Sequence, residues 1–200
     1  CGTLFPYTTL FRSPESVLAE ADYPVTIDPV ISPEYPVSEP VYGVGTTENQ
    51  YDPATAWNGS SYLVVWTDRR NYVLGGSELD IYGVRVSADG TPLDYPAIAI
   101  CTANERQMYP AVAWDGTNYL VVWQDYRASN YDIYGTRVNP AGALLDGAAE
   151  DGGFPISTAV NHQENPAIAS NDTNFLVVWE DGRSGVDIEI TANRISRSGL

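Results

Sequence analysis

Apolar and polar residues alternate in short runs along residues 50–200, which is the pattern of β-strands and not of amphipathic helices. Asp115 and Gly116 form a hairpin dipeptide between two such runs, and the following run is apolar at every position except the last. A strand that is apolar on both faces must lie between two packed layers. One unit of the pattern predicts four strands: Ala111–Trp114, Tyr119–Gln124, Asp132–Val138 and Phe154–Thr158.

This unit recurs along the chain. In one-letter code its copies read PATAWNGSSYLVVWTDRR, PAVAWDGTNYLVVWQDYR and PAIASNDTNFLVVWEDGR, and they resume after a variable loop as DIYGVRVSADG, DIYGTRVNPAG and EITANRISRSG. Equivalent residues stand 57 and 56 positions apart: Gln50, Gln107 and Gln163; Pro53, Pro110 and Pro166; Trp66, Trp123 and Trp179. A fixed period of about 40 to 60 residues is typical of repeat architectures, in which each unit buries its faces against its neighbours.

The repeat predicts an all-β fold, namely a β-propeller fragment of about three four-stranded antiparallel blades. Fourth strands are also expected at Ala97–Cys101 and Tyr42–Thr46. A β-sandwich of many hairpins is the alternative, but it gives no reason for a repeat of 57 residues. Propellers close with about four to eight blades, so we expect an open arc of a larger ring, truncated at both ends.

The chain divides into three regions. The propeller repeats occupy residues 39–200, in units of about 50–107, about 108–163 and a shorter one at 164–200. The acidic segment 14–38 predicts a linker with a candidate edge strand at Tyr23–Asp28, because proline at its density sustains neither a helix nor a sheet ladder. Within residues 1–13, the run TLFPYTTLFRS is similar to a translated sequencing adapter, so we interpret this segment as an artefact.

The two signature runs, LVVWxDxR and DIYGxRV, resemble repeats found in large secreted or cell-surface bacterial proteins, which are usually predicted to be propellers. The resemblance covers residues 40–200. It implies an extracellular or cell-surface location and a multi-domain parent protein. It carries over no catalytic residue.

Charge narrows the classes of partner. The chain has 26 acidic residues against 10 basic ones, a formal net charge of −16, and all of its basic residues are arginine. Nucleic acid and anionic membranes both require a basic surface, so neither is an expected partner. A run of about 18 apolar residues would be needed to span a membrane, and the sequence contains none.

Repeated ion pairs are the first candidate site residues. In every unit an aspartate precedes an arginine by two positions, a spacing that places both on one face of a strand: Asp68 and Arg70, Asp125 and Arg127, Asp181 and Arg183. Active sites are built once, so a pair present in all units indicates a structural ion pair and not a catalytic or metal-binding group. Arg85, Arg137 and Arg194 also repeat and receive the same interpretation, and the tryptophans are predicted to pack between blades.

Positions that do not repeat are the second group. An insertion between Arg70 and Asp80 places Tyr72 and Leu74 in a candidate contact loop, with a tolerated surface insertion as the alternative. Another loop gathers three carboxylates that are candidate calcium ligands, or else part of a solvated turn: Asp146, Glu150 and Asp151. No other metal or cofactor is expected.

Two further residues carry chemistry in other proteins but are assigned none here. His162 is the only histidine, and without a nucleophile or a second histidine it supports neither a catalytic triad nor a zinc site. Cys101 lies in an apolar strand, where we expect an inert packed thiol and no disulfide.

The sequence therefore predicts a non-catalytic extracellular module that binds protein or glycan through its loops. Its other contacts would be the remaining blades of the parent protein, or copies of itself. The alternative is a part of a propeller-type polysaccharide hydrolase or lyase, with its catalytic residues largely outside this chain. Four acids outside the repeat register would then be the candidates within it: Glu78, Glu105, Glu150 and Asp151.

Overall fold

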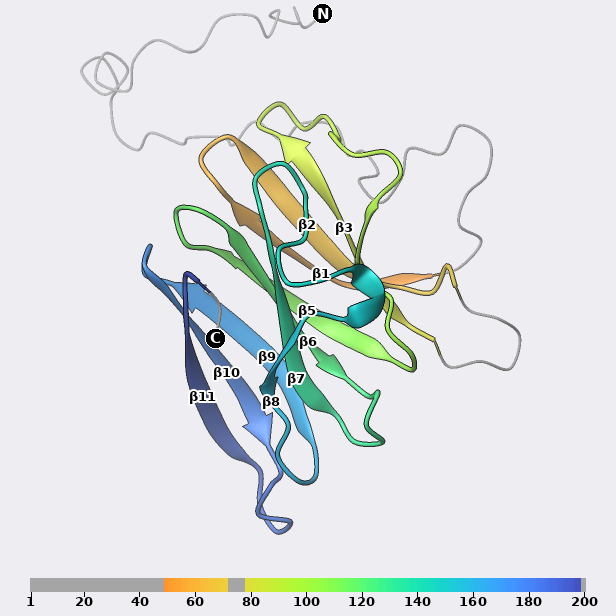
Figure 1. Cartoon of the computed structure of the whole chain (residues 1–200), viewed down its shortest axis with the longest axis vertical. Coiled ribbons are helices and arrows are strands. Elements are labelled where there is room, and N and C mark those ends of the chain that lie inside the picture. Colours follow the sequence, from red (N-terminus) through yellow and green to blue (C-terminus); the bar gives the residue numbers. More distant parts are fainter. Residues whose placement is uncertain (1–48, 72–77, 199–200) are drawn as a thin grey trace, which may run out of the picture. The chain divides into compact units, whose positions relative to one another are not determined.

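Three antiparallel sheets, one for each repeat unit, make up the residues that the computed structural model describes, 49–71 and 78–198 (Figure 1). The first sheet contains β1 (Gln50–Trp57), β2 (Ser61–Asp68), β3 (Asp80–Ser87) and β4 (Ile98–Cys101). The second contains β5 (Gln107–Trp114), β6 (Tyr119–Asp125), β7 (Asp132–Val138) and β8 (Phe154–Ser157), with the 3-10 turn η1 (Ala149–Asp151) before β8. The third contains β9 (Gln163–Ser170), β10 (Asn174–Asp181) and β11 (Glu189–Ser196).

Strands that follow one another in the sequence are neighbours within each sheet. A short polar hairpin joins the first two strands of every unit. In the second unit, Asp115 Oδ1 accepts hydrogen bonds from the N–H groups of Thr117 and Asn118, both at 2.8 Å, and Gly116 takes the left-handed conformation at φ 89°. The aspartate side chain thus supplies a hydrogen-bond acceptor for backbone N–H groups of the turn.

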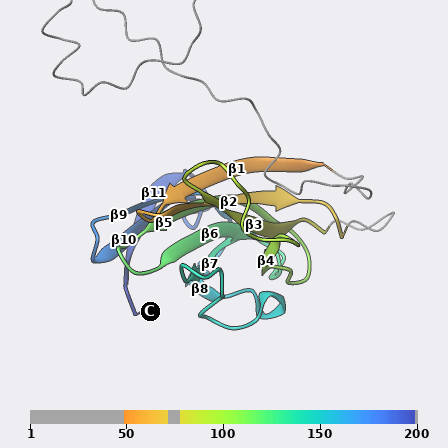
Figure 2. The ribbon, with the colours of Figure 1, turned by 90° about the horizontal axis from the view of Figure 1, so that it is seen from above.

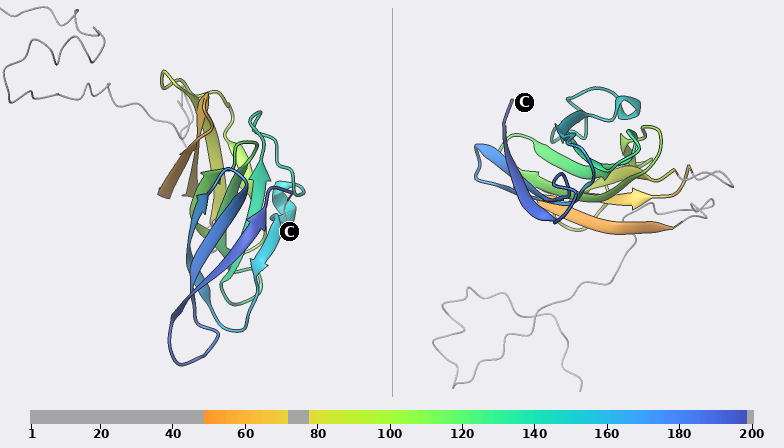
Figure 3. Two further views of the ribbon diagram at one scale, coloured as in Figure 1. Left: turned by 90° about the vertical axis from the view of Figure 1, so that its left-hand side faces the viewer. Right: turned by 90° about the horizontal axis from the view of Figure 1, so that it is seen from below.

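The sheets pack face to face. All seven residues of β6 are buried, as its double-sided apolar pattern predicts. Tyr119, Val121 and Trp123 join a cluster with the first sheet, whereas Leu120 and Val122 join a cluster with the third. The tryptophans of β6 and β10 thus pack between sheets, as predicted. Figures 2 and 3 show the sheets lying on one another as layers.

The first strands of the three sheets lie side by side, β1 against β5 and β5 against β9. The fourth strands, β4 and β8, lie at the opposite edge of their sheets. Consecutive four-stranded sheets that stack around their first strands are the blades of a β-propeller. The predicted fold class, a β-propeller fragment of three blades, is therefore confirmed.

Strand bounds agree with the prediction to within one residue, except at the first strand of a blade. β7 has the predicted bounds, but β5 begins at Gln107 and not at Ala111. A β-bulge between Met108 and Ala111 lets the strand continue past Pro110, which has no N–H group to donate to a ladder. The segments 1–38, Tyr42–Thr46 and the loop residues Tyr72 and Leu74 lie outside the described residues. Among the described residues, no helix is long and apolar enough to cross a membrane.

Candidate functional site

The repeated aspartates are enclosed by structural bonds. Asp125 is fully buried, and its Oδ2 accepts hydrogen bonds from Trp123 Nε1 at 2.9 Å and from Arg127 Nη2 at 2.5 Å. The same arrangement occurs in the other blades, with Trp66, Asp68 and Arg70 and with Trp179, Asp181 and Arg183. Burial raises the pKa of Asp68, but the bonds from Arg70 and Trp66 outweigh it and hold that pKa below its ordinary value.

Two of these arginines are themselves held in place by an aromatic ring. The guanidinium of Arg70 lies 3.9 Å from the ring centre of Tyr82, and that of Arg127 lies 4.1 Å from Tyr134. The carboxylates of Asp68, Asp125 and Asp181 therefore have no face open to a substrate. The tryptophan was not predicted as a partner, although its spacing of two residues from the aspartate in every unit was the signal.

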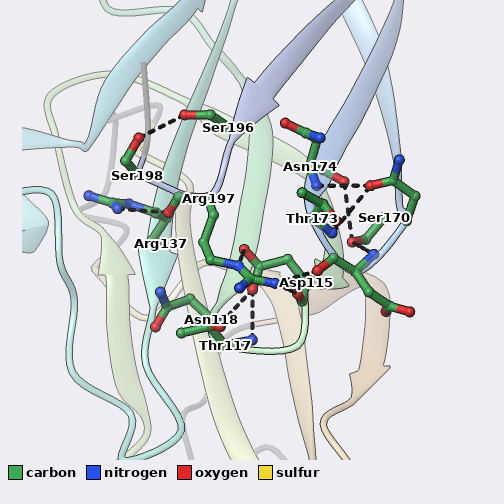
Figure 4. Close-up of polar contacts among 12 residues, drawn as sticks. Asp115, Thr117, Asn118, Arg137, Ser170, Thr173, Asn174, Ser196, Arg197 and Ser198 are labelled. Carbon is green, nitrogen blue, oxygen red and sulfur yellow. Dashed lines mark hydrogen bonds and ion pairs between the residues drawn. The ribbon is translucent and has the colours of Figure 1, made fainter.

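A second set of arginines joins neighbouring blades. Arg85 pairs with Asp94 at 2.6 Å, and Arg137 pairs with Asp146 at 2.5 Å. Each also donates to a backbone carbonyl of the next blade: Arg85 Nη1 to Pro140 O at 2.9 Å, and Arg137 Nη1 to Arg197 O at 3.1 Å (Figure 4). The repeat analysis assigned these arginines to the scaffold but did not find their partners, which stand nine residues further along the chain.

The acidic loop is not a shared ligand set in this structure. Asp146 belongs to the ion pair with Arg137, and Asp151 Oδ2 accepts the N–H of Ala148 at 3.1 Å. Asp151 and Glu150 lie in the single turn η1. Over residues 49–71 and 78–198, no group of three or more His, Cys, Asp or Glu side chains is placed to hold a metal ion.

Two of the remaining candidates from the sequence, Glu78 and Glu105, are brought close together along the backbone. Glu78 and Glu105 each precede one residue of the bridge between Leu79 and Arg106. His162 Nδ1 accepts the N–H of Tyr131 at 3.1 Å. Cys101 is a free, buried thiol, and its burial raises its pKa to about 12, which makes it a poor nucleophile.

A polar site that the sequence analysis missed lies at the start of the first strands. In each unit the identical glutamine and proline enclose two residues that differ between units: Tyr51 and Asp52, Met108 and Tyr109, Glu164 and Asn165. The second of these has φ 53° in all three blades, in the left-handed region. Asp and Asn tolerate this conformation, but for a bulky residue such as Tyr109 it is strained. Strained residues of this kind cluster at binding and catalytic sites.

The second strands contribute one variable residue each to the same place: Thr67, Gln124 and Glu180. Thr67 Oγ1 donates to Asp52 Oδ2 at 3.2 Å and accepts the N–H of Tyr109, in the next blade, at 3.3 Å. Gln124 Oε1 accepts the N–H of Asn165 at 3.0 Å, and Asn165 Nδ2 donates to Glu180 Oε2 at 3.1 Å. We call these residues the axial row: Asp52, Thr67, Tyr109, Gln124, Asn165 and Glu180.

Some residues of the axial row are buried, and others are accessible to solvent; we call the accessible side the front. Thr67 and Gln124 are buried, whereas Asn165 and Glu180 are exposed and Tyr109 is 42% exposed. The front therefore offers carboxylate acceptors, an amide that both donates and accepts, and an aromatic ring. The signal for this site in the sequence was the variable pair between an identical glutamine and an identical proline.

Aromatic side chains adjoin the row on the second blade. The rings of Tyr126 and Tyr131 are 4.8 Å apart, and that of His162 lies 5.6 Å from Tyr131. Tyr131 also reaches the first strand, because its hydroxyl lies 3.9 Å from the sulfur of Met108, which precedes Tyr109. The axial row thus continues outward into a group of aromatic rings.

Comparisons with known proteins give similarity in structure alone. No protein-family model and no curated protein matches the sequence. The chain is similar to Bacillus subtilis arabinanase Arb43A, with 12% identity, a TM-score of 0.45 and coverage of 76% of this chain and 55% of that one. It is also similar to a thermostable family-43 glycoside hydrolase, with 13% identity, a TM-score of 0.48 and coverage of 74% and 53%. An exo-1,5-α-L-arabinanase from a bovine ruminal metagenomic library is also similar, with 16% identity and a TM-score of 0.48. The similarity covers 88% of this chain and 64% of that one. The chain spans about half the length of the first two of these proteins.

Proposed function

We propose that this chain is a segment of an extracellular β-propeller that binds polysaccharide at the axial row. The observation that carries the proposal is the contrast within the repeat. The buried tryptophan, the buried aspartate and its arginine partner in each blade are identical in the three units, whereas the residues of the axial row differ, and three of them stand on a strained backbone. An extracellular location accords with the resemblance of the repeats to those of secreted and cell-surface proteins.

The chemistry of the row favours a sugar ligand. Asp52 and Glu180 can accept hydrogen bonds from sugar hydroxyls, and Asn165 can donate as well as accept. The ring of Tyr109 gives the apolar face on which a pyranose or furanose stacks. The formal net charge of −16 repels polyanions, so a neutral polysaccharide is the ligand that we propose.

A polysaccharide hydrolase is the second candidate, and the carboxylates of the row favour it. Glycoside hydrolases use two carboxyl groups held roughly 5 to 10 Å apart on either side of the scissile bond. Asp52 and Glu180 bring carboxylates to the row from the first and third blades. In this case the chain would release new reducing ends from the polysaccharide that it binds.

Affinity electrophoresis in gels that contain neutral polysaccharides tests the binding proposal. We expect the chain to be retarded by at least one of them, and the Tyr109→Ala and Asn165→Ala variants to lose the retardation. The matched control is Tyr95→Ala, because Tyr95 is 76% exposed and lies away from the row. Equal retardation of the row variants and the control would place the binding site elsewhere, and retardation by none of the polysaccharides would contradict the proposal.

The hydrolase candidate is tested on the same polysaccharides by measuring reducing ends. If the second candidate is right, the parent protein releases them and both Asp52→Asn and Glu180→Gln abolish the release while binding persists. Binding without release, in a parent protein that has its full ring, would leave the non-catalytic module as the function.

A further inference from the structure

One face of the third blade is open where the equivalent faces of the other blades are covered. The repeat places a leucine of the second strand at the same position in each unit, and Leu63 and Leu120 are 0% exposed whereas Leu176 is 50% exposed. The same holds for an isoleucine of the third strand, because Ile81 and Ile133 are 0% exposed and Ile190 is 76% exposed. Leu176, Val178 and Ile190 lie on one face of β10 and β11 by their register. We call this the open face.

In the first and second blades, the equivalent face is covered by the blade that follows. Leu63 and Ile81 are in one cluster with Tyr119, Val121 and Trp123 of the second blade. Leu120 and Ile133 are likewise in one cluster with three residues of the third blade, Phe175, Val177 and Trp179. In both interfaces a strand with the pattern aromatic–x–Val–x–Trp thus packs on the leucine and isoleucine of the preceding blade.

Polar contacts mark the two ends of both interfaces. At the axial end, Thr67 and Gln124 accept the N–H of a bulge residue of the next blade, and Glu180 is their counterpart in the third blade. At the opposite end, Arg85 and Arg137 donate to a turn carbonyl of the next blade. Their counterpart is Arg194, whose Nη1 bonds Asn174 Oδ1 within its own blade, at 2.9 Å.

We propose that the open face is the docking surface for a further unit of the same repeat. The third blade carries a counterpart for each contact that the first and second blades make with the blade after them. Glu180 would accept the N–H of the bulge residue of the arriving unit, and Arg194 would donate to its turn carbonyl. This inference concerns assembly. It shares Glu180 with the axial row, but the open face itself consists of Leu176, Val178 and Ile190, which are not part of the row.

A second copy of this chain fits the open face less well. The arriving surface must present an aromatic–x–Val–x–Trp strand. The aromatic residue of this strand is 0% exposed in the second and third blades, as Tyr119 and Phe175, whereas Tyr62 of the first blade is 41% exposed. Trp66, Trp123 and Trp179 are 3%, 0% and 3% exposed. Because Trp66 is covered even in the first blade, the occupant we propose is an additional unit and not the first blade of a second copy.

Thiol labelling of the open face tests the proposal. Leu176→Cys and Ile190→Cys are made separately in a Cys1→Ser background, where Cys101 stays silent because it is buried and its pKa is about 12. Each is placed in the 200-residue chain and in a chain extended after Leu200 by a copy of residues 144–198, which supplies a fourth strand and a further unit. We expect rapid labelling in the original chain and labelling about tenfold slower or more in the extended chain, because the docked unit must open first.

The controls separate docking from other causes. Leu120→Cys gives the rate of a fully covered position, and a Val→Asp change in the appended copy at its equivalent of Val177 should restore rapid labelling. Rapid labelling of the extended chain without that change would overturn the proposal. Slow labelling of the original chain that becomes fast on dilution would also overturn it, since a second copy would then occupy the face.

Discussion

Arg197 and Asp115 stand 82 residues apart in the sequence, yet they form an ion pair between the third and second blades, with 3.4 Å from Arg197 Nε to Asp115 Oδ2. Arg197 Nη2 also donates to the carbonyl of Asp115 at 2.7 Å and to that of Asp172 (Figure 4). Asp115 is fully buried and caps the hairpin between β5 and β6. One arginine therefore holds the hairpins of two blades together. At the equivalent position the second blade has Pro140, so this contact is absent between the first and second blades.

Replacing this arginine should destabilise the protein. We expect Arg197→Ala to lower the free energy of unfolding by about 1 to 2 kcal/mol, because it leaves a buried carboxylate oxygen without its cation. Chemical denaturation followed by tryptophan fluorescence measures the change. Arg194→Ala is the matched control, since Arg194 is exposed and makes a single bond to Asn174, so its loss should cost less than about 0.5 kcal/mol. Equal losses in the two variants would refute the clamping role of Arg197.

The buried aspartate of a blade should contribute more to the free energy of unfolding than an ion pair on the surface would. Asp125→Ala removes the acceptor of both Trp123 Nε1 and Arg127, and it leaves the guanidinium partly buried without a counter-charge. We expect a loss of about 3 kcal/mol in the free energy of unfolding. Asp187→Ala, at an exposed carboxylate, is the control and should change stability little. An unchanged melting temperature of Asp125→Ala would show that the pair is not part of the scaffold.

Asp80 and Asp68 are cross-strand partners with opposite shifts in pKa. Burial, chiefly, raises the pKa of Asp80 from 3.8 to about 6, whereas Asp68 titrates below its ordinary value. Between pH 3.8 and about pH 6, Asp80 keeps its proton in the folded state, whereas in the unfolded state it has released it. Asp80 therefore adds stability at low pH, and this contribution is lost as the pH rises through about 6.

Asp80→Asn should remove this pH dependence. Because a pKa difference of one corresponds to about 1.4 kcal/mol, we expect the variant to be more stable than the parent by about 2 kcal/mol near neutral pH and by little below about pH 4. Urea denaturation at the two pH values measures this difference. Asp68→Asn provides the opposite case and should destabilise the protein at neutral pH. Destabilisation by Asp80→Asn at neutral pH would mean that the ionised form is the one the fold favours.

The fold could be predicted because its determinants are local. The double-sided apolar pattern of Tyr119–Gln124 requires a layer on either side, and the repeat supplies those layers in the form of the neighbouring units. The bounds of the first strand were missed at Pro110, since a proline ordinarily ends a ladder and the bulge that accommodates it leaves no mark in the hydrophobic pattern.

The site was harder to predict because its contacts cross between blades. The N–H of Asn165 meets Gln124, and Arg137 meets the carbonyl of Arg197, only once the sheets are stacked. The i, i+2 rule finds partners on one strand, such as Asp125 and Arg127, but it cannot find a partner across a turn, such as Asp146 for Arg137. The variable pair between the identical glutamine and the identical proline of each unit was the sequence signal for this site.

Tyr109 offers a test of whether the axial row is maintained for function at the expense of stability. Its left-handed backbone, at φ 53°, is tolerated by asparagine and aspartate, which occupy the same position in the other blades as Asn165 and Asp52. Because the tyrosine side chain is 42% exposed, its replacement removes less packing than the loss of a core aromatic residue would. We therefore expect Tyr109→Asn to raise the free energy of unfolding by about 1 kcal/mol and to weaken the retardation by polysaccharide.

Denaturation and affinity electrophoresis on the same preparation measure the two effects together. The control is Tyr131→Phe, which keeps the ring beside Met108 and removes only a hydroxyl, so neither quantity should change greatly. A variant at Tyr109 that gains stability but binds as before would separate the strain from the ligand. A variant that loses stability would show instead that this tyrosine is held by packing, and that its conformation is a consequence of the bulge alone.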